Sequence, residues 1–100
     1  MLNQNELLEI VRGDLKVKLL KPAANERYHR FTVLRESGYE WGDLLPEPID
    51  SMIPVAMPQE VKLKTLACLM NQVYPLVAKP VDLLEACKRF ATFTPQALCN

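Results

Sequence analysis

Residues 58–93, PQEVKLKTLACLMNQVYPLVAKPVDLLEACKRFATF, carry the clearest periodicity in the chain. In the first half of this stretch, apolar residues recur every three or four positions, at Leu63, Leu66, Ala67, Met70, Val73 and Val77. This is the spacing of one face of an α-helix. Pro58 suits the first helical turn, whereas Pro75 disfavours helical geometry at the residue before it. The pattern therefore predicts a helix that begins near Pro58 and ends near Tyr74.

A second helical pattern begins at Pro80. Its apolar stripe comprises Leu83, Leu84, Cys87, Phe90 and Ala91. Asp82 and Glu85 come before Lys88 and Arg89, which is the order that the helix dipole favours. The short, proline-bounded link predicts that the two helices are neighbours in space. Their apolar faces are expected to turn into the core, and the alternative is a groove or a dimer face.

The length and composition describe one globular domain. A chain of 100 residues fits a single domain, 1–100, with a modest core. No apolar run approaches the roughly 20 residues that span a bilayer, so no membrane association is expected. The N-terminus lacks a basic segment followed by an apolar one, so no signal peptide is expected. The three cysteines include no close pair, which predicts free thiols in a reducing compartment and hence a cytoplasmic protein.

The first 36 residues allow two interpretations. In segment 15–19 apolar and polar residues alternate as in a strand, yet its leucines also continue a helical face that begins at Leu7. Segment 23–36 is equally ambiguous, with Pro22 and Gly38 as its helical start and stop signals. Apolar residues occupy both faces of the supposed strands, which favours helix. The prediction is therefore a mostly α fold, and the alternative is an α+β fold with a hairpin at about 15–34.

Residues 42–58 change character, because four prolines interrupt the segment from 46 onward. Proline breaks helices and is excluded from central strands. We expect a Pro-rich ordered loop held against the core by its apolar residues, namely Ile49, Met52, Ile53, Val55 and Met57. The alternative is that this loop binds a ligand, since long ordered loops are often functional.

The chain offers no combination of residues that predicts catalysis or a cofactor. Its soft metal ligands are Cys68, Cys87, Cys99 and His29, and none of them has the spacing of a zinc site. His29 is the one histidine, and we expect it at the surface rather than beside a nucleophile. The three glycines form no phosphate-binding loop. The prediction is a protein that is not an enzyme, with no catalytic residue, no cofactor and no metal.

The charge is balanced overall but divided into blocks. Residues 12–35 contain seven basic and two acidic residues, whereas residues 36–60 contain six acidic and no basic residues. Such blocks suit a charged partner surface, and aromatic residues beside them are typical of interface hot spots. The predicted partner-binding residues are Arg27, Arg30, Arg35, Tyr39, Trp41, Glu40, Asp43 and Glu47. We therefore expect a non-enzymatic intracellular adaptor, inhibitor or regulator that binds another protein, with a homodimer through the C-terminal helices as a related prediction.

The alternative function is that of a nucleic-acid-binding regulator that uses the basic 12–35 segment. Residues 24–45 could form a helix-turn-helix, with Arg27, Arg30 and Arg35 on phosphates. Two observations count against this alternative. The second helix would be EWGDLL, which is acidic, and the pI is about 6.6, whereas dedicated nucleic-acid-binding domains are basic.

Overall fold

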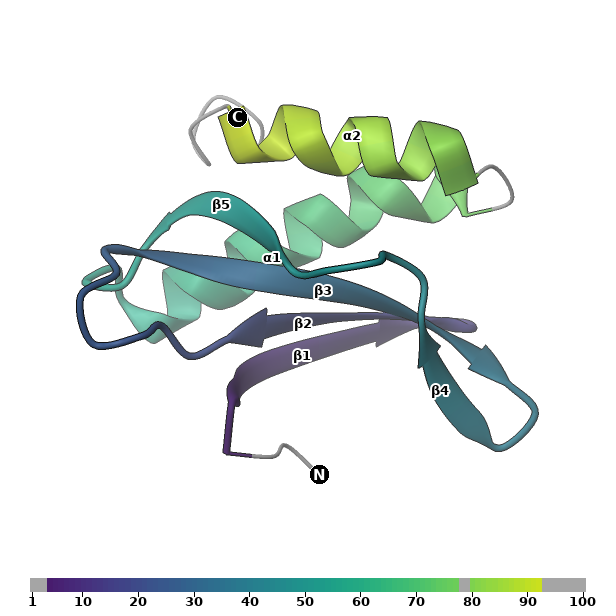
Figure 1. Ribbon diagram of the computed structural model, residues 1–100, viewed down its shortest axis with the longest axis horizontal. Helices are drawn as coiled ribbons and strands as arrows, with labels where there is room; N and C mark the ends of the chain where they lie inside the picture. The colour runs from purple at the N-terminus through teal and green to yellow at the C-terminus, as the bar shows by residue number, and fades with distance from the viewer. Residues whose placement is uncertain (1–3, 78–79, 93–100) are drawn as a thin grey trace.

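A computed structural model describes residues 4–77 and 80–92, which form an antiparallel sheet followed by two α-helices (Figure 1). The elements are β1 (Glu6–Arg12), β2 (Leu15–Leu20), β3 (Tyr28–Ser37), β4 (Glu40–Asp43), β5 (Ile49–Pro54), α1 (Gln59–Val73), the 3₁₀ turn η1 (Tyr74–Leu76) and α2 (Pro80–Thr92). The predicted mostly α fold is therefore wrong, since five strands precede the helices. The alternative α+β interpretation was the better one, and the hairpin that it placed at about 15–34 is formed by β2 and β3.

Two short turns with glycine in the first position build most of the sheet. Gly13-Asp14 connects β1 to β2, and Gly38-Tyr39 connects β3 to β4. Gly13 has φ 61° and Gly38 has φ 69°, whereas no other described residue has a positive φ. A positive φ at the first central residue alone is the pattern of a type II′ turn, which suits the twist of a hairpin. Gly38 is therefore a hairpin residue and not the predicted end of a helix.

The long strand β3 is the centre of the sheet. β2 pairs along one side of it, with Val17 opposite Val33, and β4 and β5 follow one another along the other side. The N–H of Leu44 still donates to the carbonyl of Val33, at 2.8 Å, before residues 45–48 leave the ladder. Pro46 and Pro48 lie in this interruption, and proline cannot donate to a ladder.

The predicted loop at 42–58 is therefore wrong over residues 42–43, which end β4, and over residues 49–54, which are β5. Three of the five apolar residues predicted to hold the segment do so: Ile53 is fully buried, and Ile49 and Met57 pack against the core partly buried, whereas Met52 and Val55 are not part of the core cluster. The sequence showed the prolines but not that they lie in an interruption of an edge strand.

Both helices cover the same face of the sheet, as Figure 1 shows. Their predicted positions are confirmed within one or two residues. The predicted stripe of α1 is displaced, however, because Leu63 is 44% exposed while Lys62 and Thr65 are buried. Arg12 fixes α1 to the edge strand β1, since its guanidinium lies 4.1 Å from the centre of the Tyr74 ring and donates to Oδ1 of Asn71 at 3.1 Å.

The core lies between the sheet and the helices. Alternate residues of β2 and β3, which point to one face, are fully buried: Leu15, Val17, Leu19, Phe31 and Val33. The ring of Phe31 meets that of Phe90 from α2 edge-on, at 5.6 Å between centroids and an angle of 84°. Neither α1 nor α2, the two α-helices of residues 4–77 and 80–92, covers the opposite face of the sheet, which will be called the open face.

Candidate functional site

The open face is largely polar along β1 and β2, because charged residues lie between most of the core positions; Val11, which is opposite Lys16, is an exposed apolar exception. Opposite residues of antiparallel strands point to the same face, so the register assigns side chains to it. The residues that the register places on the open face include Glu6, Glu9, Lys16, Lys18, Tyr28, Arg30, Leu34, Glu36, Trp41, Asp43 and Asp50. A sheet whose second face is charged does not need a further structural layer to cover it.

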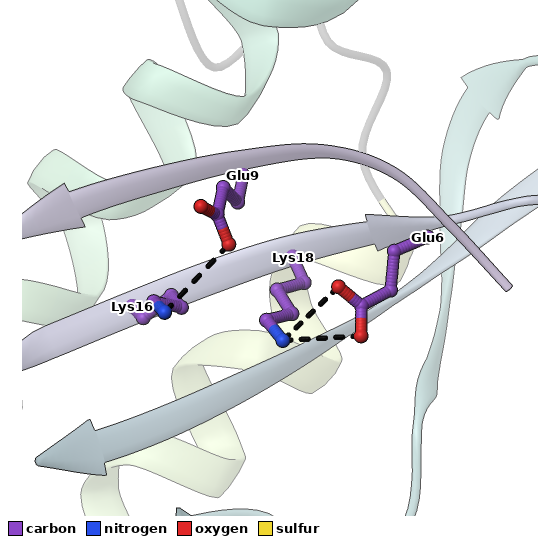
Figure 2. Close-up of polar contacts among 4 residues, drawn as sticks. All are labelled: Glu6, Glu9, Lys16 and Lys18. Atoms are coloured by element: carbon purple, nitrogen blue, oxygen red, sulfur yellow. Dashed lines mark hydrogen bonds and ion pairs between the residues drawn. The ribbon is translucent and has the colours of Figure 1, made fainter. Parts of the chain in front are cut away.

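Two ion pairs cross from β1 to β2 on this face (Figure 2). The ammonium of Lys18 donates to Oε1 of Glu6 at 3.1 Å and lies 3.0 Å from Oε2. The ammonium of Lys16 lies 3.7 Å from Oε2 of Glu9. The side chain of Glu6 is only 8% exposed and that of Lys18 only 16%, so this pair is more strongly desolvated than the second one. Both pairs hold the register of β1 against β2. Neither pair places a general base beside a nucleophilic side chain, which is the arrangement that nucleophilic catalysis needs.

Lys16 also fixes the one tryptophan. Its ammonium lies 4.3 Å from the centre of the Trp41 ring, which is cation–π geometry. Trp41 is partly buried and stands opposite Glu36 on the open face. This contact holds the ring of Trp41, one of the predicted interface residues, in a defined orientation on the open face.

The β3–β4 hairpin carries the most exposed aromatic residue of the described chain. Tyr39 sits at its turn, directly after Gly38, and is fully exposed at 102%. Glu36, Glu40 and Asp43 around it are exposed and form no ion pair with any described residue. The hairpin projects from one end of the sheet, away from the helical layer (Figure 1). It is an acidic projection with an aromatic tip.

The three arginines predicted to act together do not form one surface. Arg27 and Arg30 lie at the start of β3, and Arg30 is 4.0 Å from Glu26. Arg35 lies near the other end of β3 and on the helix side, because it pairs with Leu15 of the core face. Its guanidinium donates to the carbonyl of Val77 and lies 3.9 Å from Asp14. Arg35 therefore has intramolecular partners that hold the strand to the end of the helical layer.

The acidic residues and aromatics of the prediction do lie near one another. Tyr39, Glu40, Trp41 and Asp43 share the β3–β4 hairpin. Glu47 lies in the interruption before β5, and it lines a cavity of about 400 Å³ together with Asp43. The structure thus separates an aromatic and acidic group at one end of β3 from Arg27 and Arg30 at the other end.

The helix-turn-helix interpretation of residues 24–45 is wrong. These residues form β3, a two-residue turn and β4, so no recognition helix exists there. EWGD is a strand paired with β3. The nucleic-acid alternative loses the element on which it depended.

A surface that the sequence did not suggest lies beside Tyr28. Two cavities of about 470 and 450 Å³ both include Glu26, Arg27 and Tyr28 in their walls. Tyr28 is 43% exposed and stands between them. Asp50 and Met52 of β5 complete the larger cavity. Because the pairing of β5 with β3 was not predicted, no signal in the sequence brought these residues together.

The histidine and the cysteines differ from expectation. His29 is buried rather than at the surface, with 1% of its area exposed. Cys87 is a buried free thiol, and its burial raises the pKa to about 12, so the thiolate is suppressed at neutral pH. Cys68 is disulfide-bonded, so the prediction of free thiols is wrong for this residue. Cys99 lies outside the described residues. Within the described part of the chain, no three His, Cys, Asp or Glu side chains are grouped so as to hold a metal ion.

Searches for related proteins found no match. No protein-family model, no curated protein sequence and no solved structure matches this chain. In residues 4–77 and 80–92, neither helix has the length and apolar character needed to cross a membrane.

Proposed function

We propose that this protein is a non-enzymatic adaptor, inhibitor or regulator, and that its β3–β4 hairpin is the element that binds another protein. The observation that carries the proposal is the complete exposure of Tyr39 at the hairpin tip. Tyrosine is among the residues enriched in interface hot spots, where a large ring fills a pocket of the partner. Two other features of the hairpin support the same function.

The first is rigidity. Gly38 permits the tight turn, the pairing of β4 with β3 holds the hairpin closed, and the contact between Lys16 and Trp41 holds the aromatic residue behind the turn. A binding element that is ordered in advance loses less conformational entropy on association. The hairpin therefore presents Tyr39 in a defined place.

The second feature is charge. Glu36, Glu40 and Asp43 are exposed without a paired cation among the described residues, so the surface around Tyr39 is negative. Complementary charge accelerates association and selects the partner. We therefore expect a partner with a basic surface around a pocket that receives the tyrosine ring.

The experiment compares two tyrosines at opposite ends of β3. Tagged wild-type protein, Tyr39→Ala and Tyr28→Ala are used to capture proteins from lysate, with and without nuclease, and bound proteins are quantified by mass spectrometry. The proposal expects a nuclease-resistant partner whose recovery falls at least about tenfold with Tyr39→Ala, which corresponds to a hot-spot loss of about 1.4 kcal/mol. Recovery with Tyr28→Ala should stay close to wild type. A partner that is lost with Tyr28→Ala and kept with Tyr39→Ala would move the site to the cavities beside Tyr28.

The nuclease arm tests the second candidate function, nucleic-acid binding through the basic 12–35 segment. The exposed Arg27 and Arg30 are the observation that supports it. If every captured protein disappears with nuclease, and affinity falls steeply with salt as counterion release requires, this second function replaces the first. Light scattering of the purified protein tests for a homodimer, which would make the second copy the partner.

A cytoplasmic location is part of the proposal, and the bond at Cys68 is the observation that opposes it. Disulfides are rare in reducing compartments. Alkylating thiols in intact cells before lysis, followed by peptide mapping, shows whether Cys68 is oxidised there. A reduced Cys68 agrees with the cytoplasm, and an oxidised one places the protein elsewhere.

A further inference from the structure

The two edges of the sheet differ in how they are protected. β4 and β5 share one edge: β4 has four residues with an acid at each end, and β5 is irregular against β3 and ends at Pro54. Short strands, charges, bulges and prolines are features that prevent an edge strand from pairing with another chain. β1 forms the opposite edge over seven residues, without a proline or a lysine. After the register shift between Glu6 and Leu8, its ladder with β2 is regular.

The backbone of β1 presents unused hydrogen-bonding groups at this edge. The N–H of Glu36 on β3 donates to the carbonyl of Asp14 at 2.9 Å, so every second residue of β2, counted from Asp14, bonds to β3. The residues between them bond to β1, and they are the register partners of its even-numbered residues, such as Ile10. The N–H and C=O groups of Glu9 and Val11 therefore point outward, and no other described residue bonds to them.

Apolar side chains accompany these backbone groups on both faces of the edge. Val11 is 51% exposed on the open face, and Leu8 and Ile10 are only partly buried on the helix side. On that side α1 packs on β1 and β2, and its Leu63 is 44% exposed. Leu63 lies about three helical turns before Tyr74, the residue that contacts β1, so both belong to the flank of α1 beside this edge.

The charges of β1 are already balanced within the chain. Each charged residue of the strand has an intramolecular partner: Glu6 pairs with Lys18, Glu9 with Lys16, and Arg12 with the Tyr74 ring and Asn71. An edge with balanced charges selects neither a basic nor an acidic partner, because charge complementarity needs an unpaired charge. It does suit a second copy of itself, whose β1 carries the same balanced charges.

We propose that β1 pairs with β1 of a second copy of this chain, antiparallel and centred on Ile10. The two outward residues then lie opposite each other, Glu9 against Val11 of the second copy and Val11 against its Glu9. Each of these pairs exchanges two N–H···O=C bonds, which uses every outward donor and acceptor of the two residues. A register centred on Glu9 or on Val11 would instead require Leu7 at the register shift or Gly13 in the turn.

The two copies are related by a two-fold axis between their Ile10 residues, so the interface is isologous. Ile10 meets its own copy in a pair without hydrogen bonds, where side chains approach most closely. No two like charges stand directly opposite each other. Both helical layers lie on the same face of the joined sheet, so the flanks of α1 that carry Leu63 turn towards each other. The β3–β4 hairpin lies at the other edge of the sheet, so this inference does not depend on the function proposed for Tyr39.

Sedimentation equilibrium of the purified protein from about 1 µM to 1 mM measures the association. A single strand pair lies at the low end of interface sizes, below about 1,200 Å², so we expect a dimer that dissociates on dilution. Val11→Lys places a cation on the outer edge and should weaken the dimer at least about tenfold. Val61→Lys is the matched control, because Val61 is 38% exposed on another flank of α1 than Leu63, and it should leave the dimer unchanged. Circular dichroism shows that both variants are folded.

Amide hydrogen exchange of the wild-type protein, followed by NMR at low and high protein concentration, locates the contact without a variant. The outward N–H groups of Glu9 and Val11 become bonded in the dimer, so their protection should rise with protein concentration. The N–H of Ile10 bonds to β2 in both states, so its protection should change less. Tyr39→Ala should have no effect on the association.

Four outcomes would overturn the proposal. The first is a protein that stays monomeric up to about 1 mM. The second is a dimer that survives Val11→Lys or leaves the amides of Glu9 and Val11 unprotected, because the copies then meet elsewhere. The third is a dimer that is lost with Tyr39→Ala, which would place the second copy on the hairpin. The fourth is a monomer in which Glu9 and Val11 become protected only when a different protein is added, which would assign the edge to a strand of that protein.

Discussion

Replacing Gly13 with alanine should destabilise the fold more than replacing Gly38, although both glycines start the same kind of turn. Their φ angles are 61° and 69°, a region that residues with a Cβ atom rarely adopt. The backbone strain of an alanine there is about 1–3 kcal/mol, and it is common to both positions. What differs is the space around the new methyl group.

A Cβ atom at Gly13 would lie 3.1 Å from the hydroxyl oxygen of Tyr74 and 3.5 Å from its Cε2, whereas nothing lies within 4 Å at Gly38. Tyr74 cannot move away freely, because the guanidinium of Arg12 rests on its ring at 4.1 Å. Disturbing such a cation–π contact costs about 0.5–1 kcal/mol at an exposed site. We therefore expect Gly38→Ala to cost about 1–3 kcal/mol and Gly13→Ala to cost about 0.5–1 kcal/mol more.

Urea unfolding followed by circular dichroism measures both values, and Tyr74→Phe supplies the control background. This change removes the nearest atom, so Gly13→Ala should cost less in Tyr74→Phe than in wild type, while the cost of Gly38→Ala should not change. Equal costs for the two glycines in both backgrounds would refute the packing of Tyr74 on the turn. No cost at either position would refute the positive φ angles, and with them the turn type.

Three further outcomes follow from burial. Phe31→Ala should lower the free energy of unfolding by about 3–5 kcal/mol, since the ring is fully buried against α2, and a loss below 1 kcal/mol in urea unfolding would contradict this. The thiol of Cys87, with its pKa raised to about 12, should resist iodoacetamide at pH 8 in the native protein and react with it in urea, which peptide mapping measures. Equal rates in the native and the unfolded protein would place this thiol at the surface. Glu6→Ala should lower the free energy of unfolding by about 1–3 kcal/mol, because it leaves the mostly buried Lys18 unpaired. Glu9→Ala removes a side chain that is 29% exposed and should lower it by less than about 1 kcal/mol. The reverse order of urea midpoints would contradict the burial of the two pairs.

The helices were predicted from the sequence and most of the sheet was missed, for a physical reason that lies in residues 13–39. Prolines at 58, 75 and 80 mark the helix boundaries, and a spacing of three and four residues has no strand counterpart. In β3, by contrast, apolar residues occur on both faces. Leu34 lies on the open face between Lys16 and Asp43 and is still only 8% exposed. A two-sided apolar strand resembles a helix in any count of periodicity.

The decisive signal was present in the two dipeptides Gly13-Asp14 and Gly38-Tyr39. A glycine in the first position of a two-residue turn, flanked by segments of period two, indicates a hairpin. Because Gly38 also fits the C-terminal stop of a helix, the hairpin formed by β3 and β4 was not predicted. The candidate site was limited in the same way. Residue type alone proposed Tyr39 and Trp41 as candidates, but only the register separates Arg30 from Arg35, because a shift of one residue exchanges the faces of a strand. The burial of His29 depends on the same register.

The sheet is a meander in which every pairing joins strands close in the chain, and the helices that cover it come after the last strand. During translation all five strands therefore emerge from the ribosome before the two helices that shield Phe31 and Ile53. About 40 further residues complete α2, which takes about 2–8 s at 5–20 residues per second. For that time the nascent chain carries an apolar sheet face with no cover. A chaperone that binds apolar strands has this interval in which to act, and truncation before α1 leaves that face uncovered for good.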